Sequence, residues 1–153
     1  RVMGAFEGTI ERVVALATLM PIVAGIAGNS GNQTMTLIIR SIALGQVTMS
    51  NARRLLLKEL AIAALNGLVW GGMAGLAAWL LYRDTPHGVL LGLTMTLAMV
   101  LNLLVGALIA LAVPMALERL GRDPAIGSSV LLTFSTDSMG FLIFLGLATL
   151  LFR

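Results

Sequence analysis

One carboxylate stands alone in a long apolar stretch near the C-terminus. Asp137 is the only ionisable side chain between Ala125 and Phe152, and the other residues there are apolar, small or hydroxylic. A charge at the centre of a membrane costs at least about 3 kcal/mol on insertion scales. Such a residue therefore persists only where it faces protein, water or a counter-ion. Hydroxyl groups precede and follow it in the run Thr133-Phe-Ser-Thr-Asp137-Ser138, so this oxygen-rich position predicts a cation site.

A second polar cluster begins at Gly28 and reads Gly-Asn-Ser-Gly-Asn-Gln-Thr up to Thr34. Glycines at every third position from Gly25 allow close backbone approach or a local break of the helix. Amides and hydroxyls at membrane depth fit two arrangements: they line a polar cavity, or they hold neighbouring helices together. The density of polar residues in this one segment favours the cavity.

The sequence lacks the residues that most other kinds of functional site require. The sequence has no cysteine, which excludes disulfides and thiolate metal sites. His87 is the only histidine, in the segment Arg83-Asp-Thr-Pro-His-Gly88, and we interpret it as a solvated loop residue. A serine nucleophile would lack a base and an aspartyl protease would lack its second intramembrane carboxylate, so we do not expect an enzyme. No basic stripe with interleaved aromatic residues indicates nucleic-acid binding.

The elements that carry these residues are membrane helices. The chain is 58% hydrophobic and 11% charged, with a mean hydropathy of +0.98, which predicts an all-α membrane protein that contacts lipid. Uncharged runs long enough to cross a bilayer predict spans at Val13–Ile39, Leu60–Tyr82, Gly88–Leu117 and, with Asp137 as its only interruption, Ala125–Phe152. The opening Arg1–Phe6 is apolar but too short to span, so we expect it to end an earlier helix.

The distribution of Lys and Arg predicts the orientation of these spans in the membrane. Six basic residues fall in the two connections on one side: Arg40, Arg53, Arg54, Lys58, Arg119 and Arg122. Three fall on the other side: Arg12, Arg83 and Arg153. The positive-inside rule then places the loops near Arg53 and Arg119 in the cytoplasm and the C-terminus outside.

Two stripes of small residues predict tight helix packing. The second span carries Ala63, Gly67, Gly71 and Gly75 at four-residue spacing, and the third carries a similar row that begins at Asn102. We expect Asn102 to make an interhelical hydrogen bond. In the loop before the second span, Ser50 or Asn51 is the expected N-cap of an interfacial helical start that runs to Lys58.

The polar segment resembles a known signature. Pro21-Ile-Val-Ala-Gly-Ile-Ala-Gly-Asn-Ser-Gly-Asn-Gln-Thr, with Ser135-Thr-Asp-Ser-Met-Gly140 near the end, is similar to the MgtE magnesium channels and transporters over nearly the whole of residues 1–153. The resemblance implies a homodimeric pore domain of five transmembrane helices, the first mostly absent here, in the plasma membrane (the inner membrane of bacteria). The cytoplasmic magnesium-sensing domains of such proteins are expected to be absent from this chain.

The resemblance also implies the site. Asp137 would bind Mg²⁺, with Thr133 one turn earlier contributing its hydroxyl or its carbonyl oxygen. The spans Val13–Ile39 and Ala125–Phe152 would line the pore. The expected lining residues are Gly28, Asn29, Asn32, Gln33, Thr34, Ser129, Thr136 and Gly140.

Three alternatives stay open at the level of sequence. Asp137 could be a structural partner inside the bundle, although the spans hold no Lys or Arg to pair with it. A secondary transporter in which Asp137 binds a coupling proton or Na⁺ is the closest rival to a channel. The transported ion could be Mg²⁺, Mn²⁺, Co²⁺ or Ca²⁺, since all accept carboxylate oxygen.

Overall fold

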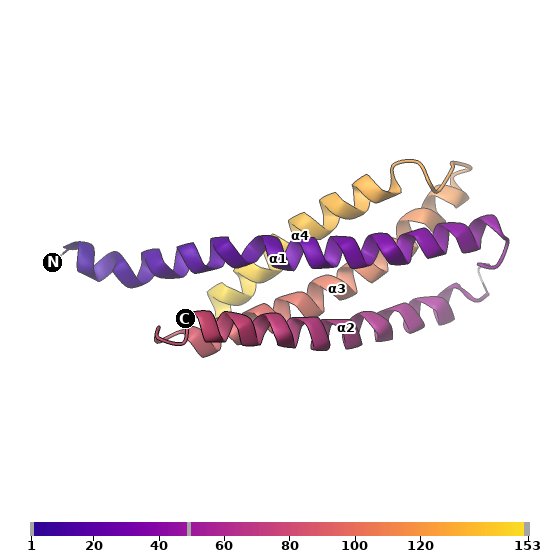
Figure 1. The fold of residues 1–153 in the computed structure, drawn as a ribbon. Coiled ribbons are helices and arrows are strands. Elements are labelled where there is room, and N and C mark those ends of the chain that lie inside the picture. The colour runs from indigo at the N-terminus through magenta and orange to yellow at the C-terminus, as the bar shows by residue number, and fades with distance from the viewer. Residues whose placement is uncertain (1, 49, 152–153) are drawn as a thin grey trace.

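Four helices make up the part of the chain that the structure, a computed structural model, describes: residues 2–48 and 50–151 (Figure 1). They are α1 (Val2–Ala43), α2 (Ala52–Leu81), α3 (Gly88–Arg119) and α4 (Ser128–Leu151). Each contains a stretch long and apolar enough to cross a membrane, which in α1 is Val14–Ala43. No strand occurs in the described residues, so the predicted all-α class is confirmed.

Positive-φ glycines stop two of the helices. Beyond α1, Gly45 has φ 70° and the amide of Gln46 donates to the Ser41 carbonyl at 2.9 Å. Beyond α3, Gly121 has φ 70° and the amide of Arg122 donates to the Leu117 carbonyl at 2.9 Å. Both ends are Schellman motifs, in which a left-handed residue lets the chain turn back over its last carbonyls.

The helix bounds differ most from the predicted spans at the starts of α1 and α2. α1 begins at Val2, so residues 2–6 continue into the first span and do not end a separate helix. No proline interrupts residues 2–13, and the polar residues there are compatible with a helix that extends beyond the membrane. α2 begins at Ala52, which confirms the helical start before Leu60. Phe152, the predicted end of the last span, lies outside the described residues.

Asn51 precedes α2 as predicted but does not cap it with its side chain. Its Oδ1 accepts a hydrogen bond from the Thr48 amide at 2.8 Å, and its Nδ2 donates to the Gln46 carbonyl at 2.7 Å. The Asn51 side chain therefore stabilises the loop. Its hydrogen bonds to the loop backbone leave it unavailable to the free N–H groups in the first turn of α2.

Close backbone contacts hold α2 against α3. A Cβ atom added at Gly75 would lie 2.6 Å from the Gly92 carbonyl oxygen, and one at Gly67 would lie 2.8 Å from the Cα of Val100. Thr96 adds a hydrogen bond from its Oγ1 to the Gly71 carbonyl at 3.0 Å. The predicted small-residue stripe thus serves packing, since larger side chains would push the helices apart.

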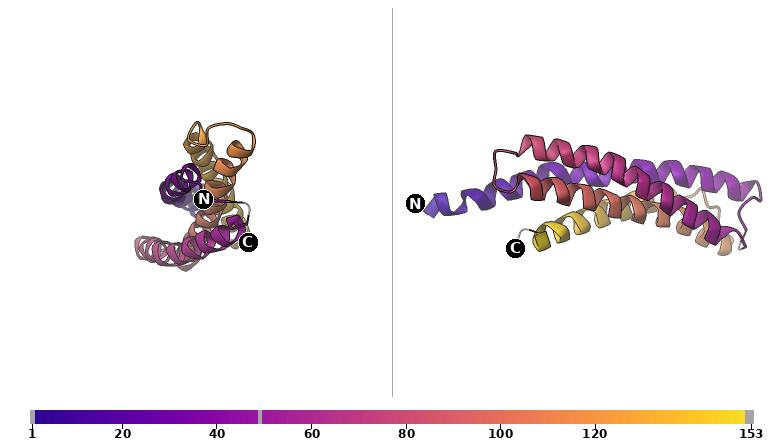
Figure 2. Two further views of the ribbon diagram at one scale, coloured as in Figure 1. Left: turned by 90° about the vertical axis from the view of Figure 1, so that its right-hand side faces the viewer. Right: turned by 90° about the horizontal axis from the view of Figure 1, so that it is seen from below.

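α3 is the centre of the bundle and packs along each of the other three helices. α1 also packs against α4, which crosses it obliquely (Figure 1). The loops 44–51 and 120–127 lie at one end of the molecule and the turn 82–87 lies at the other (Figure 2). Arg122 lies in the second of these loops, and the other basic residues of this end lie in the helix turns beside the loops: Arg40 in α1, Arg53, Arg54 and Lys58 in α2, and Arg119 in α3. They share one end of the molecule, as the orientation prediction requires.

Candidate cation site

Asp137 lies near the middle of α4. It is about 14 Å along the axis from Ser128, at about 1.5 Å per residue. Its side chain is half-buried, and no residue that the structure describes donates a hydrogen bond to its carboxylate or pairs with it. An intramembrane carboxylate without a protein partner is available to water or to a cation.

Asp137 continues a row of oxygen-bearing side chains on α4. Ser129, Thr133 and Asp137 follow one another at four-residue spacing, which places them on one side of the helix. Ser129 and Thr133 are exposed. The Thr133 carbonyl accepts a hydrogen bond from Thr136 Oγ1 at 3.2 Å.

The polar segment of α1 lies beside this row. Asn29 and Gln33 are exposed, and Asn32 is half-buried. Asn32 Oδ1 accepts a hydrogen bond from Ser129 Oγ at 2.8 Å, which links the two polar rows directly. α1 stays a continuous helix through Gly25, Gly28 and Gly31, so the alternative of a local break is not adopted. Gly28 and Gly31 allow the close approach of α4, whereas an added Cβ at Gly25 would meet nothing within 4 Å.

The closest approach of α1 and α4 lies directly behind the polar rows. A Cβ atom at Gly28 would lie 3.3 Å from Thr136 Oγ1, and one at Gly140 would lie 3.3 Å from the Cα of Ala24. Gly28, Thr136 and Gly140 are all buried at this contact. In the single chain they pack between α1 and α4, and their place in the pore lining stays a prediction.

Asn102 of α3 ties the two helices together behind the site. Its side chain is fully buried, and its Nδ2 donates to the Val23 carbonyl of α1 at 3.3 Å and to the Thr136 carbonyl of α4 at 3.1 Å. The expected interhelical hydrogen bond is therefore present twice. Because Thr136 precedes Asp137, this bridge sets the position of the carboxylate relative to α1.

Thr34 does not join the other predicted lining residues. It lines a separate cavity of about 20 Å³ on the α2 side of α1, together with Ser30, Glu59 and Asn66. A cavity of that size holds about one water molecule. Glu59 and Asn66 were not predicted as site residues. Their seven-residue separation on one helix, which returns to the same face, was the signal that could have identified them.

A single chain offers one carboxylate to a cation. No group of three or more His, Cys, Asp or Glu side chains that could hold a metal is found among the described residues. The site that one chain can provide is therefore a hydroxyl and carboxylate row facing a row of amides, which suits a cation that keeps much of its hydration shell.

Known proteins resemble this chain over almost its whole length. Residues 20–147 match the MgtE family, described as a divalent cation transporter. The chain is 38% identical over 153 residues to a magnesium transporter MgtE of Thermus thermophilus, covering 98% of this chain and 32% of the relative. It is 30% identical over 148 residues to proteins of the same name from Bacillus subtilis and Enterococcus faecalis, covering 97% of this chain and 32% of each relative.

The chain thus spans about a third of the length of these relatives. The family match extends over the polar segment of α1, both small-residue stripes and the Asp137 row of α4. The length of the family match, the identity to three named transporters and the four helices able to span a membrane all indicate the same family. The chain belongs to the MgtE family of divalent cation transporters.

Proposed function

We propose that this chain forms the membrane pore of a magnesium channel or transporter and that Asp137 is its cation site. The observation that carries the proposal is the half-buried Asp137 carboxylate, which has no partner among the described residues and stands in a hydroxyl row beside the amides of α1. The family match and the named relatives support the choice of a divalent cation.

The proposed coordination leaves water around the ion. Mg²⁺ prefers six oxygen ligands and dehydrates reluctantly, so protein sites commonly supply one or two carboxylates and leave waters in place. Asp137 and the Thr133 hydroxyl would contact the hydrated ion. The waters of the ion would form hydrogen bonds with the polar side chains around it: Asn29, Asn32, Gln33 and Ser129. Weak contacts of this kind allow the ion to leave as well as to enter.

The proposed unit is a homodimer with the ion on its two-fold axis. One Asp137 carries one negative charge, which leaves a divalent ion half-compensated where uncompensated charge is costly. A two-fold axis brings the same surface of two chains together and supplies the second carboxylate. Following the Lys/Arg distribution, the loops near Arg53 and Arg119 would be cytoplasmic and the C-terminus outside the cell.

An aqueous path along α1 is tested with Asn32→Cys. The chain has no native cysteine, so a single thiol reports on one position. We expect this thiol to react with a small water-soluble maleimide or methanethiosulfonate, and we expect added Mg²⁺ to slow the reaction. Leu68→Cys, on the exposed apolar side of α2, is the matched control and should react poorly. Equal reactivity at the two positions, unaffected by Mg²⁺, would favour a packing role for the polar segment.

The dimer axis is tested by crosslinking along α4. Thr133→Cys places a thiol on the proposed axial face, and we expect it to crosslink between two chains on mild oxidation. Leu142 is also exposed, but it lies nine residues later, which puts it on the opposite side of the helix from Thr133. Leu142→Cys should therefore stay uncrosslinked. Crosslinking at position 142 and not at position 133, measured by non-reducing gel electrophoresis, would place the axis elsewhere.

Ion flux distinguishes the channel from a coupled transporter. In proteoliposomes, we expect Mg²⁺ influx to follow the Mg²⁺ gradient and the membrane potential when no Na⁺ or proton gradient is present. Influx that stops unless a second ion gradient is imposed would instead assign Asp137 to a coupling ion.

A further inference from the structure

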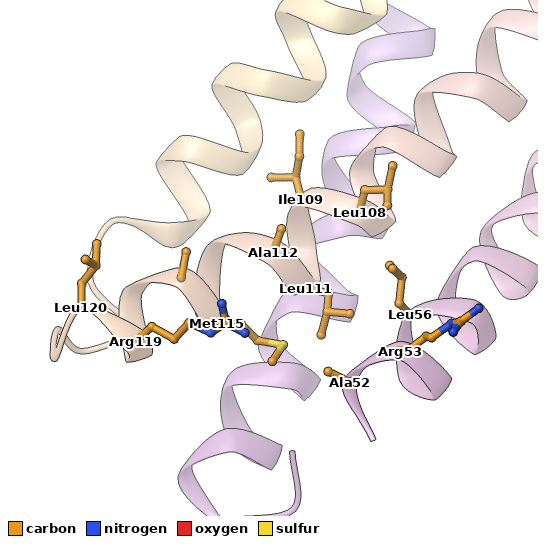
Figure 3. A pocket seen from close by; sticks show the side chains of 11 residues that line it. Ala52, Arg53, Leu56, Leu108, Ile109, Leu111, Ala112, Met115, Arg119 and Leu120 are labelled. Atoms are coloured by element: carbon orange, nitrogen blue, oxygen red, sulfur yellow. The ribbon is translucent and has the colours of Figure 1, made fainter. Parts of the chain in front are cut away.

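A second open site lies at the basic end of the bundle, away from Asp137. It is a groove of about 670 Å³ between the first turns of α2 and the last turns of α3 (Figure 3). Its lining residues, apart from two arginines, are all aliphatic, alanine or methionine. The volume is in the range of about 300–1,000 Å³ that holds an organic ligand.

The chemistry of the groove changes along its length. Leu108 and Ile109 of α3 line its deep part. Leu120, directly after the end of α3, marks its mouth; it lies twelve residues after Leu108, about 18 Å away at the helical rise. Arg119 of α3 and Arg53 of α2 line the groove near that mouth, one on each helix, and the Arg53 side chain extends away from α3 in this view (Figure 3). The groove is therefore apolar toward the middle of the membrane and cationic at the end where the loops lie.

The residues that line the groove include two arginines and no acidic residue, while Glu118 and Asp123 stand beside Arg119 and Arg122 outside the lining. The first turn of α2 holds Arg53 and Arg54 and no acidic residue, and the last turn of α3 holds Arg119. Arg122 follows in the next loop and is exposed. Basic pockets between transmembrane helices at the cytoplasmic surface are the sites at which anionic lipid headgroups bind.

We propose that this groove binds one anionic phospholipid, with an acyl chain against Leu108, Ile109 and Met115 and the phosphate between Arg53 and Arg119. The order of apolar and cationic residues along the groove is that of a phospholipid in one leaflet: chain at depth, phosphate at the surface. A free phosphate would leave the apolar depth unfilled, and an uncharged lipid would not use the arginines. The site shares no residue with the Asp137 row, and it rests on the proposed function only for the orientation that puts this end of the bundle at the cytoplasmic surface.

The test is lipid retention by the purified protein, measured by native mass spectrometry during titration with phosphatidylglycerol and, separately, phosphatidylcholine. Each basic residue near the surface contributes about fivefold to anionic-lipid affinity. We therefore expect the double variant Arg53→Gln, Arg119→Gln to bind phosphatidylglycerol roughly 25-fold more weakly. Arg83→Gln, an exposed arginine in the turn at the opposite end, is the matched control and should bind as the wild type does.

A second variant separates shape from charge. Ala112 lines the groove and is exposed, so Ala112→Phe fills it without changing a charge. We expect this variant to keep its helical circular-dichroism signal and to lose phosphatidylglycerol retention. Equal retention of both lipids by the wild type, or unchanged phosphatidylglycerol binding in both groove variants, would overturn the proposal. So would a loss of dimer mass in Ala112→Phe without a change in lipid binding, because a second copy would then occupy the groove.

Discussion

Replacing Asp137 with asparagine is expected to abolish divalent-cation transport while the bundle stays folded. The carboxylate has no hydrogen-bond or ion-pair partner among the described residues, so an amide of the same shape removes the charge without breaking an internal contact. The charge pair that is lost is the one between the bound cation and the Asp137 carboxylate. Breaking a buried charge pair costs about 3–5 kcal/mol, and the lower figure already corresponds to a loss of cation affinity of more than about 100-fold. Mg²⁺ influx into proteoliposomes that contain a Mg²⁺-sensitive dye measures the effect.

The control for this variant is another acid whose loss changes net charge by the same amount. Asp84 lies in the turn between α2 and α3, with a side chain 97% exposed. Asp84→Asn should transport like the wild type. Unimpaired influx through Asp137→Asn, in protein shown to be inserted and of native mass, would remove Asp137 from the transport path.

A methyl group added at Gly140 is expected to destabilise the contact that holds the Asp137 helix. Its Cβ would lie 2.6 Å from Asn102 Nδ2 and 3.3 Å from the Cα of Ala24, so α4 must move or Asn102 must give up its bridge to Val23 and Thr136. Overpacking of this kind costs about 1–3 kcal/mol. The midpoint of thermal unfolding in detergent should fall in Gly140→Ala.

A matched substitution on the same helix isolates this contact. A Cβ at Gly146 would meet nothing within 4 Å, so Gly146→Ala should not lower the midpoint, since alanine favours a helix over glycine by about 0.5–1 kcal/mol. Removing the clashing amide in Gly140→Ala, Asn102→Ala should recover part of the loss, the coupling expected of two residues in contact. An unfolding midpoint that falls equally in Gly146→Ala and Gly140→Ala, or a double variant that shows strictly additive losses, would contradict this packing account.

Patterns that depend on neighbours along one helix were readable from the sequence. The stripe that includes Gly67 and Gly75 was expected to face another helix, and both positions touch α3 through backbone atoms. Asn102 was expected to bridge helices because an isolated amide at membrane depth needs partners, and it has two. These inferences needed only spacing and the cost of an unsatisfied polar group.

Features that depend on helical phase or on a second chain are harder to predict from the sequence. Thr34 was grouped with Asn32 because they are close in sequence, but two residues along a helix turn the side chain by about 200°, and Thr34 faces α2. The helical start before Leu60 was predicted and is present, because arginine and lysine side chains can continue a helix into the headgroup region. The proposed dimer axis needs a second chain, which no pattern within one chain can position.

The central claim is that two Asp137 carboxylates share one divalent ion, and the number of bound ions tests it most directly. Equilibrium titration of the purified protein with Mg²⁺, compared between the wild type and Asp137→Asn, isolates the ions that depend on this residue. We expect the substitution to remove one bound ion per two chains. Identical binding in both proteins, or a loss of one ion for every chain, would contradict the shared site.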